Sequence, residues 1–471
     1  MEEKTSIIQN SVIYFIGNVG SKALTFMLIP IYSHFLSKSQ FGQYDIFLTT
    51  LSLLGPIVTL QMSESVYRWL KDAETSAYKR KEAITNSLFT VVSGQVIFLL
   101  LSVFLALFTE IKYINYFFFS LLSTGLFQYF QQITRGLRNN KLYSKSGIVN
   151  AVCQIVFNVI FLYTMNDKVT AIFLSIILSY FTSTIYIIIS SDILRNIRIN
   201  TISQSVILDL VSYSWPLIPN LISWWLVTFV NRYIVMIFLG IEQNGVFAIA
   251  NRFPSIIVIL NSIFSMALQD HVLSSDKIDI KASNILFNKF IKLQFCSVLL
   301  LIPATKLLFT YFVDLKFINS LNYLPYLYTA AAFFSIATFL EANLVKAKKT
   351  MDIFYSTFIG AVINIVITFL LIEKIDLYAP TAGTLLGFFG IWISRNYWLK
   401  SSEQIRPELL PLSLLLFCIV VFIYMDSIGS YYIEIGLLIA ATLLSWIFNK
   451  ELIQHLGSSF LKSVQIKLGK N

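Results

Sequence analysis

A succession of about fourteen apolar runs, each near the roughly 20 residues that an α-helix needs to cross a bilayer, constrains this chain most strongly. Hydrophobic residues make up 56% of the 471 residues, and charged residues only 13%. Soluble domains carry about 25% charged residues, so the sequence predicts an all-α polytopic membrane protein. The runs lie near residues 11–33, 43–67, 84–108, 113–134, 147–165, 169–191, 213–239, 245–270, 290–312, 322–345, 351–372, 379–399, 409–425 and 431–449.

Lysine and arginine residues are distributed unevenly over the loops between these runs. With a cytoplasmic amino terminus, about 26 of the 35 fall on the cytoplasmic side and about five on the other. Cytoplasmic loops carry such an excess, so both termini are expected in the cytoplasm. The first run continues for a full span, which predicts a retained helix rather than a cleavable signal.

The short loops argue against several classes of function. Outer loops of at most about ten residues leave no room for the catalytic site of a membrane glycosyltransferase or polymerase. The sequence has no phosphate loop and no HExxH motif, and its three histidines are scattered, so no ATPase, metal site or cofactor is expected. The net charge of +10 is spread over many loops, which disfavours nucleic-acid binding.

Two sets of residues recur at matching spacing in the two halves of the chain. The first set is Phe35, Leu36, Gln40, Gly42 and Tyr44, which corresponds to Phe238, Leu239, Gln243, Gly245 and Phe247. A weaker echo relates Ala151, Val152, Ile155 and Val156 to Ala361, Val362, Ile365 and Val366. They predict two six-helix lobes in parallel repeat, residues 1–199 and 200–402, with two extra C-terminal helices in 403–471. Transporters of this plan bind substrate between the lobes.

Lys22 is the charged residue nearest the middle of the first run. Asn18, Ser21 and Thr25 share its helical face. At about 16 Å from either end of the run, Lys22 is too deep to extend comfortably to the headgroups. We expect Lys22 to line a polar cavity, with Asn18 and Thr25 as secondary contacts.

Arg232 and Arg252 lie in the seventh and eighth runs, at similar depth on either side of one turn. Two guanidinium groups at one level repel each other unless an anion or acids compensate them. Neither run carries an acid at that depth, and Glu242 in the turn is the nearest. The pair is therefore expected to bind a phosphate-like anion, with buried salt bridges as the alternative. Lys306, near a run end, is expected to reach the headgroups or to be a secondary contact.

Several polar and aromatic side chains accompany these cations. Asn231 precedes Arg232, and Trp224 and Trp225 are expected either to stack on sugar or isoprenoid or to pack between helices. Hydrogen bonds across helices are expected from Asn158 and Asn364. Gate ion pairs or solvated helix ends are expected at Glu64, Asp270, Glu341 and Arg395.

Segments 11–60 and 212–271 resemble the polysaccharide-unit flippases of the O-antigen or teichuronic type. These belong to the multidrug/oligosaccharidyl-lipid/polysaccharide exporter superfamily. The resemblance is carried by SVIYFIGNVGSKALTFMLIPIYSHFLSKSQFGQYDIF, WPLIPNLISWWL, NRYIVMIFLG and GVFAIANRFPSIIVILNSIF. Family members commonly carry Asp where this chain has Asn231, so a role for that acid is not carried over.

The resemblance implies a flippase, not an enzyme, in the bacterial cytoplasmic membrane. It would move an undecaprenyl-diphosphate-linked oligosaccharide repeat unit from the inner to the outer leaflet by alternating access. Lys22, Arg232 and Arg252 would offset the desolvation of the diphosphate. Membrane lipids, a polysaccharide polymerase and other assembly proteins are the expected partners, and no cofactor is needed.

Two other transport functions of the superfamily are alternatives. A peptidoglycan-precursor (lipid II type) flippase needs the same cationic cavity. A drug or cation antiporter needs intramembrane carboxylates in the amino-terminal lobe, where this sequence places Lys22. Neighbouring glycosyltransferase genes would favour the polysaccharide unit, and cell-wall or sporulation genes would favour lipid II.

Overall fold

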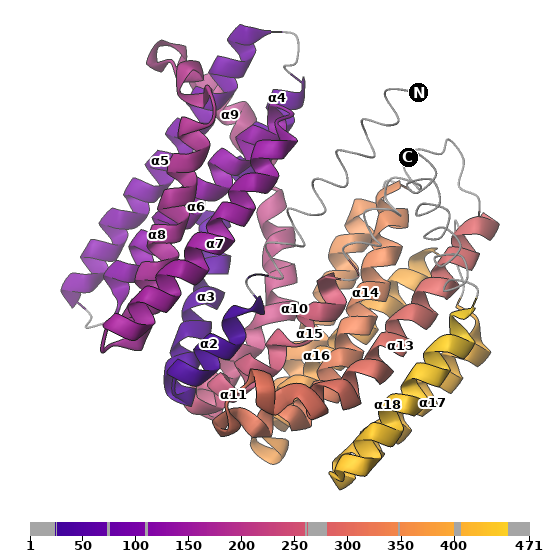
Figure 1. The fold of residues 1–471 in the computed structure, drawn as a ribbon. Coiled ribbons are helices and arrows are strands. Elements are labelled where there is room, and N and C mark those ends of the chain that lie inside the picture. The colour runs from indigo at the N-terminus through magenta and orange to yellow at the C-terminus, as the bar shows by residue number, and fades with distance from the viewer. Residues whose placement is uncertain are drawn as a thin grey trace, which may run out of the picture. The chain divides into compact units, whose positions relative to one another are not determined.

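The computed structural model consists of helices and their connections in the part of the chain that it describes (Figure 1). No strand occurs within this part. The all-α fold class is therefore confirmed. The described part comprises residue 24 and residues 26–72, 76–108, 112–259, 261, 280–346, 349–399 and 407–450.

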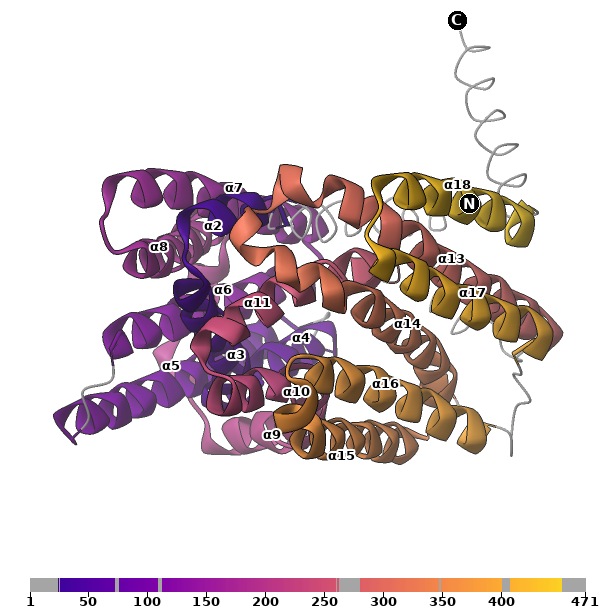
Figure 2. The same cartoon turned by 90° about the horizontal axis from the view of Figure 1, so that it is seen from below.

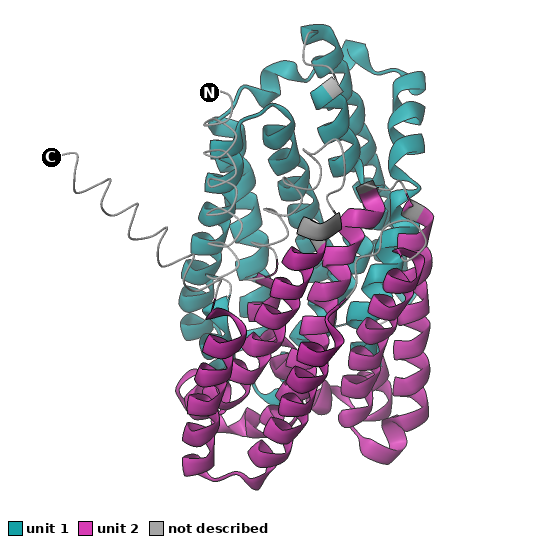
Figure 3. Cartoon of the chain, turned by 90° about the vertical axis from the view of Figure 1, so that its right-hand side faces the viewer, with its two compact units in different colours: residues 1–233 teal, residues 234–471 magenta. Residues whose placement is uncertain are grey.

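The chain divides into two compact units, residues 1–233 and residues 234–471 (Figure 3). In unit 1, apolar side chains of α4, α5 and α6 such as Met62, Ile84 and Phe127 form a buried core. Its helices are α2 (Leu28–Phe35), α3 (Lys38–Val58), α4 (Met62–Asp72), α5 (Ala77–Phe108), α6 (Ile114–Gly136), α7 (Asn140–Thr164), α8 (Lys168–Ile189), the 3₁₀ turns η1 (Ile193–Asn196) and η2 (Ile199–Thr201), α9 (Gln204–Ser214) and most of α10 (Leu217–Phe238).

Local sequence sets the ends of α3. Its first turn is a capping box, in which the Ser37 hydroxyl accepts a hydrogen bond from the Gln40 N–H and the Gln40 side chain accepts one from the Ser37 N–H. Pro56 lies in the last turn, and Leu60 and Gln61 follow with φ of 49° and 53°. Because the left-handed region interrupts helical geometry, α4 starts at an angle of 50° to α3.

Unit 2 contains the remaining helices, and α17 and α18 run beside α13 (Figure 2). Gly240 (φ 88°) precedes α11, and Gly429 (φ 77°) separates α17 from α18. A residue without a Cβ adopts these backbone angles most readily. The elements are α11 (Ile241–Arg252), α13 (Ile280–Phe312), η3 (Leu315–Tyr323), α14 (Leu324–Lys346), α15 (Thr350–Ile375), α16 (Tyr378–Leu399), α17 (Leu409–Ile428) and α18 (Tyr431–Phe448).

The protein is a multi-pass membrane protein. Within the described residues, nine helices are long and apolar enough to cross a membrane, or ten if the bent pair of α3 and α4 is one span. The predicted number of fourteen is not confirmed. α6 and α16 occupy two of the predicted runs but are not among the nine, and α6 buries polar side chains such as Ser120, Ser123 and Thr124. Residues 1–23 and 262–279, which include parts of two further predicted spans, lie outside the described part.

The two units do not coincide with the lobes expected from the internal repeat. The repeat places a boundary after residue 199, whereas α9 belongs to unit 1 because it packs on α4 and α5. The units are defined by contacts within the folded chain, whereas the lobes are defined by residues that recur at matching spacing in the sequence. The lobes 1–199 and 200–402 and the added segment 403–471 stay a prediction about the repeat.

Close packing of α15 on α16 depends on glycine. A Cβ on Gly383 would meet the Thr368 hydroxyl and lie 2.7 Å from the Asn364 carbonyl oxygen. We expect Gly383→Ala to lower the free energy of unfolding by about 1–3 kcal/mol, because two helix backbones would have to separate. Denaturant titration of the purified protein in detergent measures this. Gly436→Ala is the matched control, since nothing lies within 4 Å of its added Cβ; equal stability of the two variants would contradict the prediction.

Candidate functional site

A buried ion pair joins α3 and α10 within unit 1. Arg232 Nε lies 2.8 Å from Asp45 Oδ2, and the side chains are 9% and 5% exposed. Arg232 Nη1 donates to the Thr228 carbonyl oxygen at 2.9 Å, and the Phe229 ring centroid lies 4.9 Å from the guanidinium carbon. A buried charge is costly without a partner, and Asp45 compensates the charge of Arg232.

Further hydrogen bonds extend this contact along both helices. Trp225 Nε1 donates to the Thr49 carbonyl oxygen at 3.1 Å and to Ser52 Oγ at 3.2 Å. The Tyr233 hydroxyl lies 2.6 Å from Thr50 Oγ1. We call Asp45, Thr49, Thr50, Ser52, Trp225, Arg232 and Tyr233 the α3–α10 polar seam. On α3, Asp45, Thr49 and Ser52 are four and three positions apart, and on α10, Trp225 and Arg232 are seven positions, or two turns, apart. One face of α3 therefore meets one face of α10.

The absence of a nearby acid for Arg232, inferred from the sequence, is wrong. The acid comes from α3 rather than from the neighbouring runs or the Glu242 turn. Sequence distance hid this partner, although an aspartate close to the start of the apolar run 43–67 was a usable signal. Within the described residues of the α3–α10 polar seam, Arg232 is therefore paired with an acid. A buried salt bridge was the alternative expected for this residue.

The other expected contact residues are distributed over the chain. Asn231 is buried and Trp224 half-buried on α10, and Arg252 is half-buried in the last turn of α11 in unit 2. Trp225 is fixed by its hydrogen bonds to α3, which is the packing role. Three expected residues lie outside the described part: Asn18, Lys22 and Thr25.

Lys306 has two acidic partners that its sequence position did not indicate. Its Nζ lies 3.1 Å from Asp426 Oδ1 and 2.9 Å from Glu434 Oε1. The acids belong to α17 and α18, so this cluster joins the two C-terminal helices to α13.

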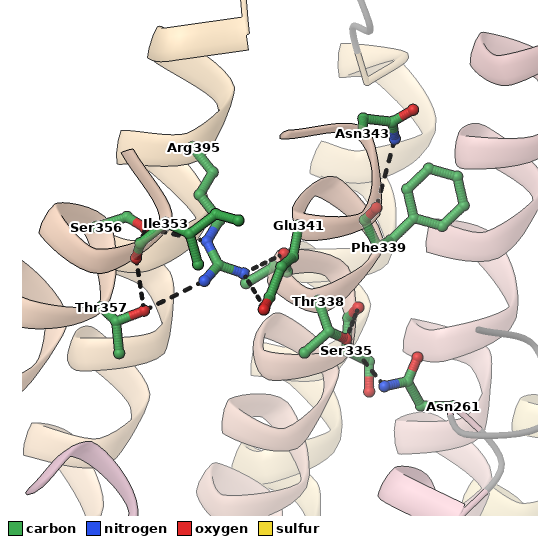
Figure 4. Close-up of polar contacts among 11 residues, drawn as sticks. Asn261, Ser335, Thr338, Phe339, Glu341, Asn343, Ile353, Ser356, Thr357 and Arg395 are labelled. Atoms are coloured by element: carbon green, nitrogen blue, oxygen red, sulfur yellow. Dashed lines mark hydrogen bonds and ion pairs between the residues drawn. The ribbon is translucent and has the colours of Figure 1, made fainter. Parts of the chain in front are cut away.

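Arg395 is at the centre of a polar network among α14, α15 and α16 (Figure 4). Its side chain is fully buried, and Nη1 donates to Glu341 Oε2 at 3.0 Å and to the Ala337 carbonyl oxygen at 2.7 Å. Nε and Nη2 donate to Ser356 Oγ and Thr357 Oγ1. Glu341 and Arg395 were expected in gate ion pairs or at solvated helix ends, and the structure pairs them with each other. The two hydroxyl partners were missed because Ser and Thr are common in membrane helices. Of the other expected gate residues, Glu64 accepts a hydrogen bond from Gln132, and Asp270 lies outside the described part.

The sequence of residues 7–269, over half of the chain, matches the family described as polysaccharide biosynthesis protein. The chain belongs to this family. The matched segment contains the α3–α10 polar seam, Arg252 and Lys22, but not Lys306. Membership in the polysaccharide biosynthesis family agrees with the resemblance carried by the two segments 11–60 and 212–271.

Solved membrane transporters share the fold of this polysaccharide biosynthesis protein. A structure of the lipid II flippase MurJ in an inward closed conformation has a TM-score of 0.67 and 13% identity, covering 94% of this chain and 100% of that one. An inward-facing MATE multidrug resistance transporter of the MOP superfamily has a TM-score of 0.61 and 13% identity, covering 85% and 95%. A MOP superfamily transporter from Pyrococcus furiosus has a TM-score of 0.54 and 13% identity, covering 84% and 96%. No curated protein matches the chain in sequence.

Proposed function

We propose that this protein is a flippase that moves an undecaprenyl-diphosphate-linked oligosaccharide repeat unit from the inner to the outer leaflet of a bacterial cytoplasmic membrane. The family match carries the proposal, because a polysaccharide biosynthesis protein built of membrane helices acts where sugar units are attached to lipid. The fold supports it, since a lipid II flippase and multidrug transporters share it. Both termini of the chain are cytoplasmic in this proposal.

The buried ion pair of unit 1 bears on the role proposed for Arg232. Because Asp45 neutralises Arg232, that pair adds little net attraction for a diphosphate. Asp45 instead holds the guanidinium in one orientation, and Arg can then donate hydrogen bonds in a fixed direction. In this proposal, Lys22 and Arg252 each add positive charge for the diphosphate. Asn231 and Trp224 would contact the sugar or the isoprenoid.

A drug or cation antiporter is the second candidate, favoured by one observation. Unit 1 contains a buried carboxylate, Asp45, and a carboxylate is the group that a cation transporter needs. Its pairing with Arg232 at 2.8 Å leaves it poorly suited to attract a cation, because the guanidinium already balances its charge. A lipid II flippase needs the same anion contacts and is separated from the proposal by the lipid that accumulates.

Deletion and complementation test the proposal. A strain lacking the gene is expected to lose surface polysaccharide and to accumulate lipid-linked repeat units inside, and the wild-type gene to restore export. Lys22→Ala and Arg252→Ala are each expected to reduce export by about tenfold, the effect of one lost charge-assisted contact. Arg195→Ala is the matched control, because Arg195 is 84% exposed and its ion pair is with Asp192, three residues away and also exposed.

Each other outcome contradicts part of the proposal. Normal surface polysaccharide with altered drug tolerance would show that the protein is a drug antiporter rather than a flippase. Accumulation of lipid II, with unchanged amounts of lipid-linked repeat units, would show that lipid II is the transported substrate. Full export by well-expressed Lys22→Ala and Arg252→Ala variants would remove the cationic contacts.

A further inference from the structure

Three charged side chains meet where α13, α17 and α18 pack together. Lys306 comes from α13, Asp426 from the last turn of α17, and Glu434 from the first turn of α18. Both carboxyl groups approach the same Nζ, at 3.1 Å and 2.9 Å, so these two oxygens are at most about 6 Å apart. The two carboxyl groups therefore share one ammonium group. We call these residues the Lys306 triad.

The Lys306 triad is buried to different extents. The side chain of Glu434 is only 2% exposed, that of Asp426 14%, and that of Lys306 24%. Nζ directs its hydrogen bonds to Asp426, to both Oδ1 and the main-chain carbonyl oxygen. Within the described residues, no donor reaches either Glu434 oxygen with hydrogen-bond geometry. Glu434 is therefore a buried carboxyl group whose oxygens receive no hydrogen bond from the described residues and which shares Lys306 with a second carboxyl group.

The charges of the Lys306 triad do not balance if all three groups are ionised. One ammonium group faces two carboxylates, which leaves one uncompensated negative charge among apolar helices. An uncompensated charge at such a site is costly, and two neighbouring carboxylates disfavour simultaneous ionisation. One proton between the carboxyl groups removes both problems, since the protonated oxygen becomes a donor to the other group.

We infer that the Lys306 triad is an exchangeable-proton site. Glu434 carries the proton and uses it to donate a hydrogen bond to Asp426. The site lies outside the segment that matches the polysaccharide biosynthesis family. It does not depend on the transported substrate. Loss of the proton would leave two negative charges on α17 and α18 and only one positive charge, that of Lys306, on α13. This change of charge links protonation to the packing of the C-terminal helices.

The surroundings contain one more titratable group that faces the site. Tyr326 of α14 lies within electrostatic range of Asp426. A neutral phenol does not compensate the negative charge. Among the described residues of the elements that pack on α13, α17 and α18, the ion pairs at this site join the triad members to one another.

Infrared difference spectroscopy of the purified full-length protein tests the inference. Protonated carboxyl groups have a carbonyl stretching band separate from that of carboxylates. We expect the wild type to show such a band at neutral pH, shifting in D₂O and disappearing reversibly at high pH. Glu434→Gln and Asp426→Asn are each expected to lose it, because either change leaves a balanced Lys306 and carboxylate pair. Lys306→Met is expected to strengthen the band, because both carboxyl groups then take up protons.

Glu408→Gln is the matched control. Glu408 pairs with Lys292 at 2.9 Å, but its side chain is 52% exposed, so this pair needs no proton. Its removal should leave the band unchanged. A band that persists in both Glu434→Gln and Asp426→Asn, or is missing from the wild type, would overturn the inference. Thermal stabilisation by Na⁺ over choline without any band would assign the site to a metal cation instead. None of these readouts requires transport, so they separate this inference from the flippase proposal.

Discussion

Asp45→Ala is expected to lower the free energy of unfolding by about 3–5 kcal/mol, because it leaves the Arg232 guanidinium buried without its acid. Both side chains are at least nine-tenths buried and are 2.8 Å apart. Water can therefore do little to replace the lost carboxylate. Denaturant titration of the purified protein in detergent measures the change. Asp209→Ala is the matched control, because Asp209 is exposed on α9 and should change stability by less than about 0.5 kcal/mol.

A second variant distinguishes the ion pair from simple packing. Asp45→Ala combined with Arg232→Met removes both charges while keeping most of the arginine volume. We expect it to recover much of the stability lost in Asp45→Ala, because no uncompensated charge is left. A double variant as unstable as the sum of both single variants would show that Asp45 acts through its other contacts.

Arg395→Met is expected to lower the free energy of unfolding by about 3 kcal/mol, which is the low end of the range for broken buried pairs. The low end applies because Glu341 keeps 29% of its side chain exposed and can be hydrated. The Ser356 and Thr357 hydroxyls and the Ala337 carbonyl oxygen also lose a donor (Figure 4). The variant therefore loses the polar contacts that hold α14, α15 and α16 together at this point. The same denaturant titration measures it.

Glu341→Gln separates the charge from the hydrogen bonds of Arg395. The amide oxygen of glutamine can accept the bond from Nη1, so this variant should lose less stability than Arg395→Met. Combining both changes should cost little beyond Arg395→Met, because the two side chains share one interaction. Additive losses would mean that the carboxylate of Glu341 stabilises the protein independently of Arg395.

The amino-acid sequence by itself determined the fold class and the family. Long apolar runs leave their backbone groups no water to bind, so they must form helices, and this holds whatever the neighbours are. The approximate places of α5, α7, α8 and α15 follow directly from such runs. Glu341 and Arg395 were singled out as charged residues near helix ends, but the sequence did not say that they pair with each other.

Only the tertiary structure decided which charges meet. Arg232 finds Asp45 on α3, and Lys306 finds two acids more than a hundred positions away. Hydropathy and spacing describe one helix at a time, whereas a buried ion pair depends on which helix faces come together.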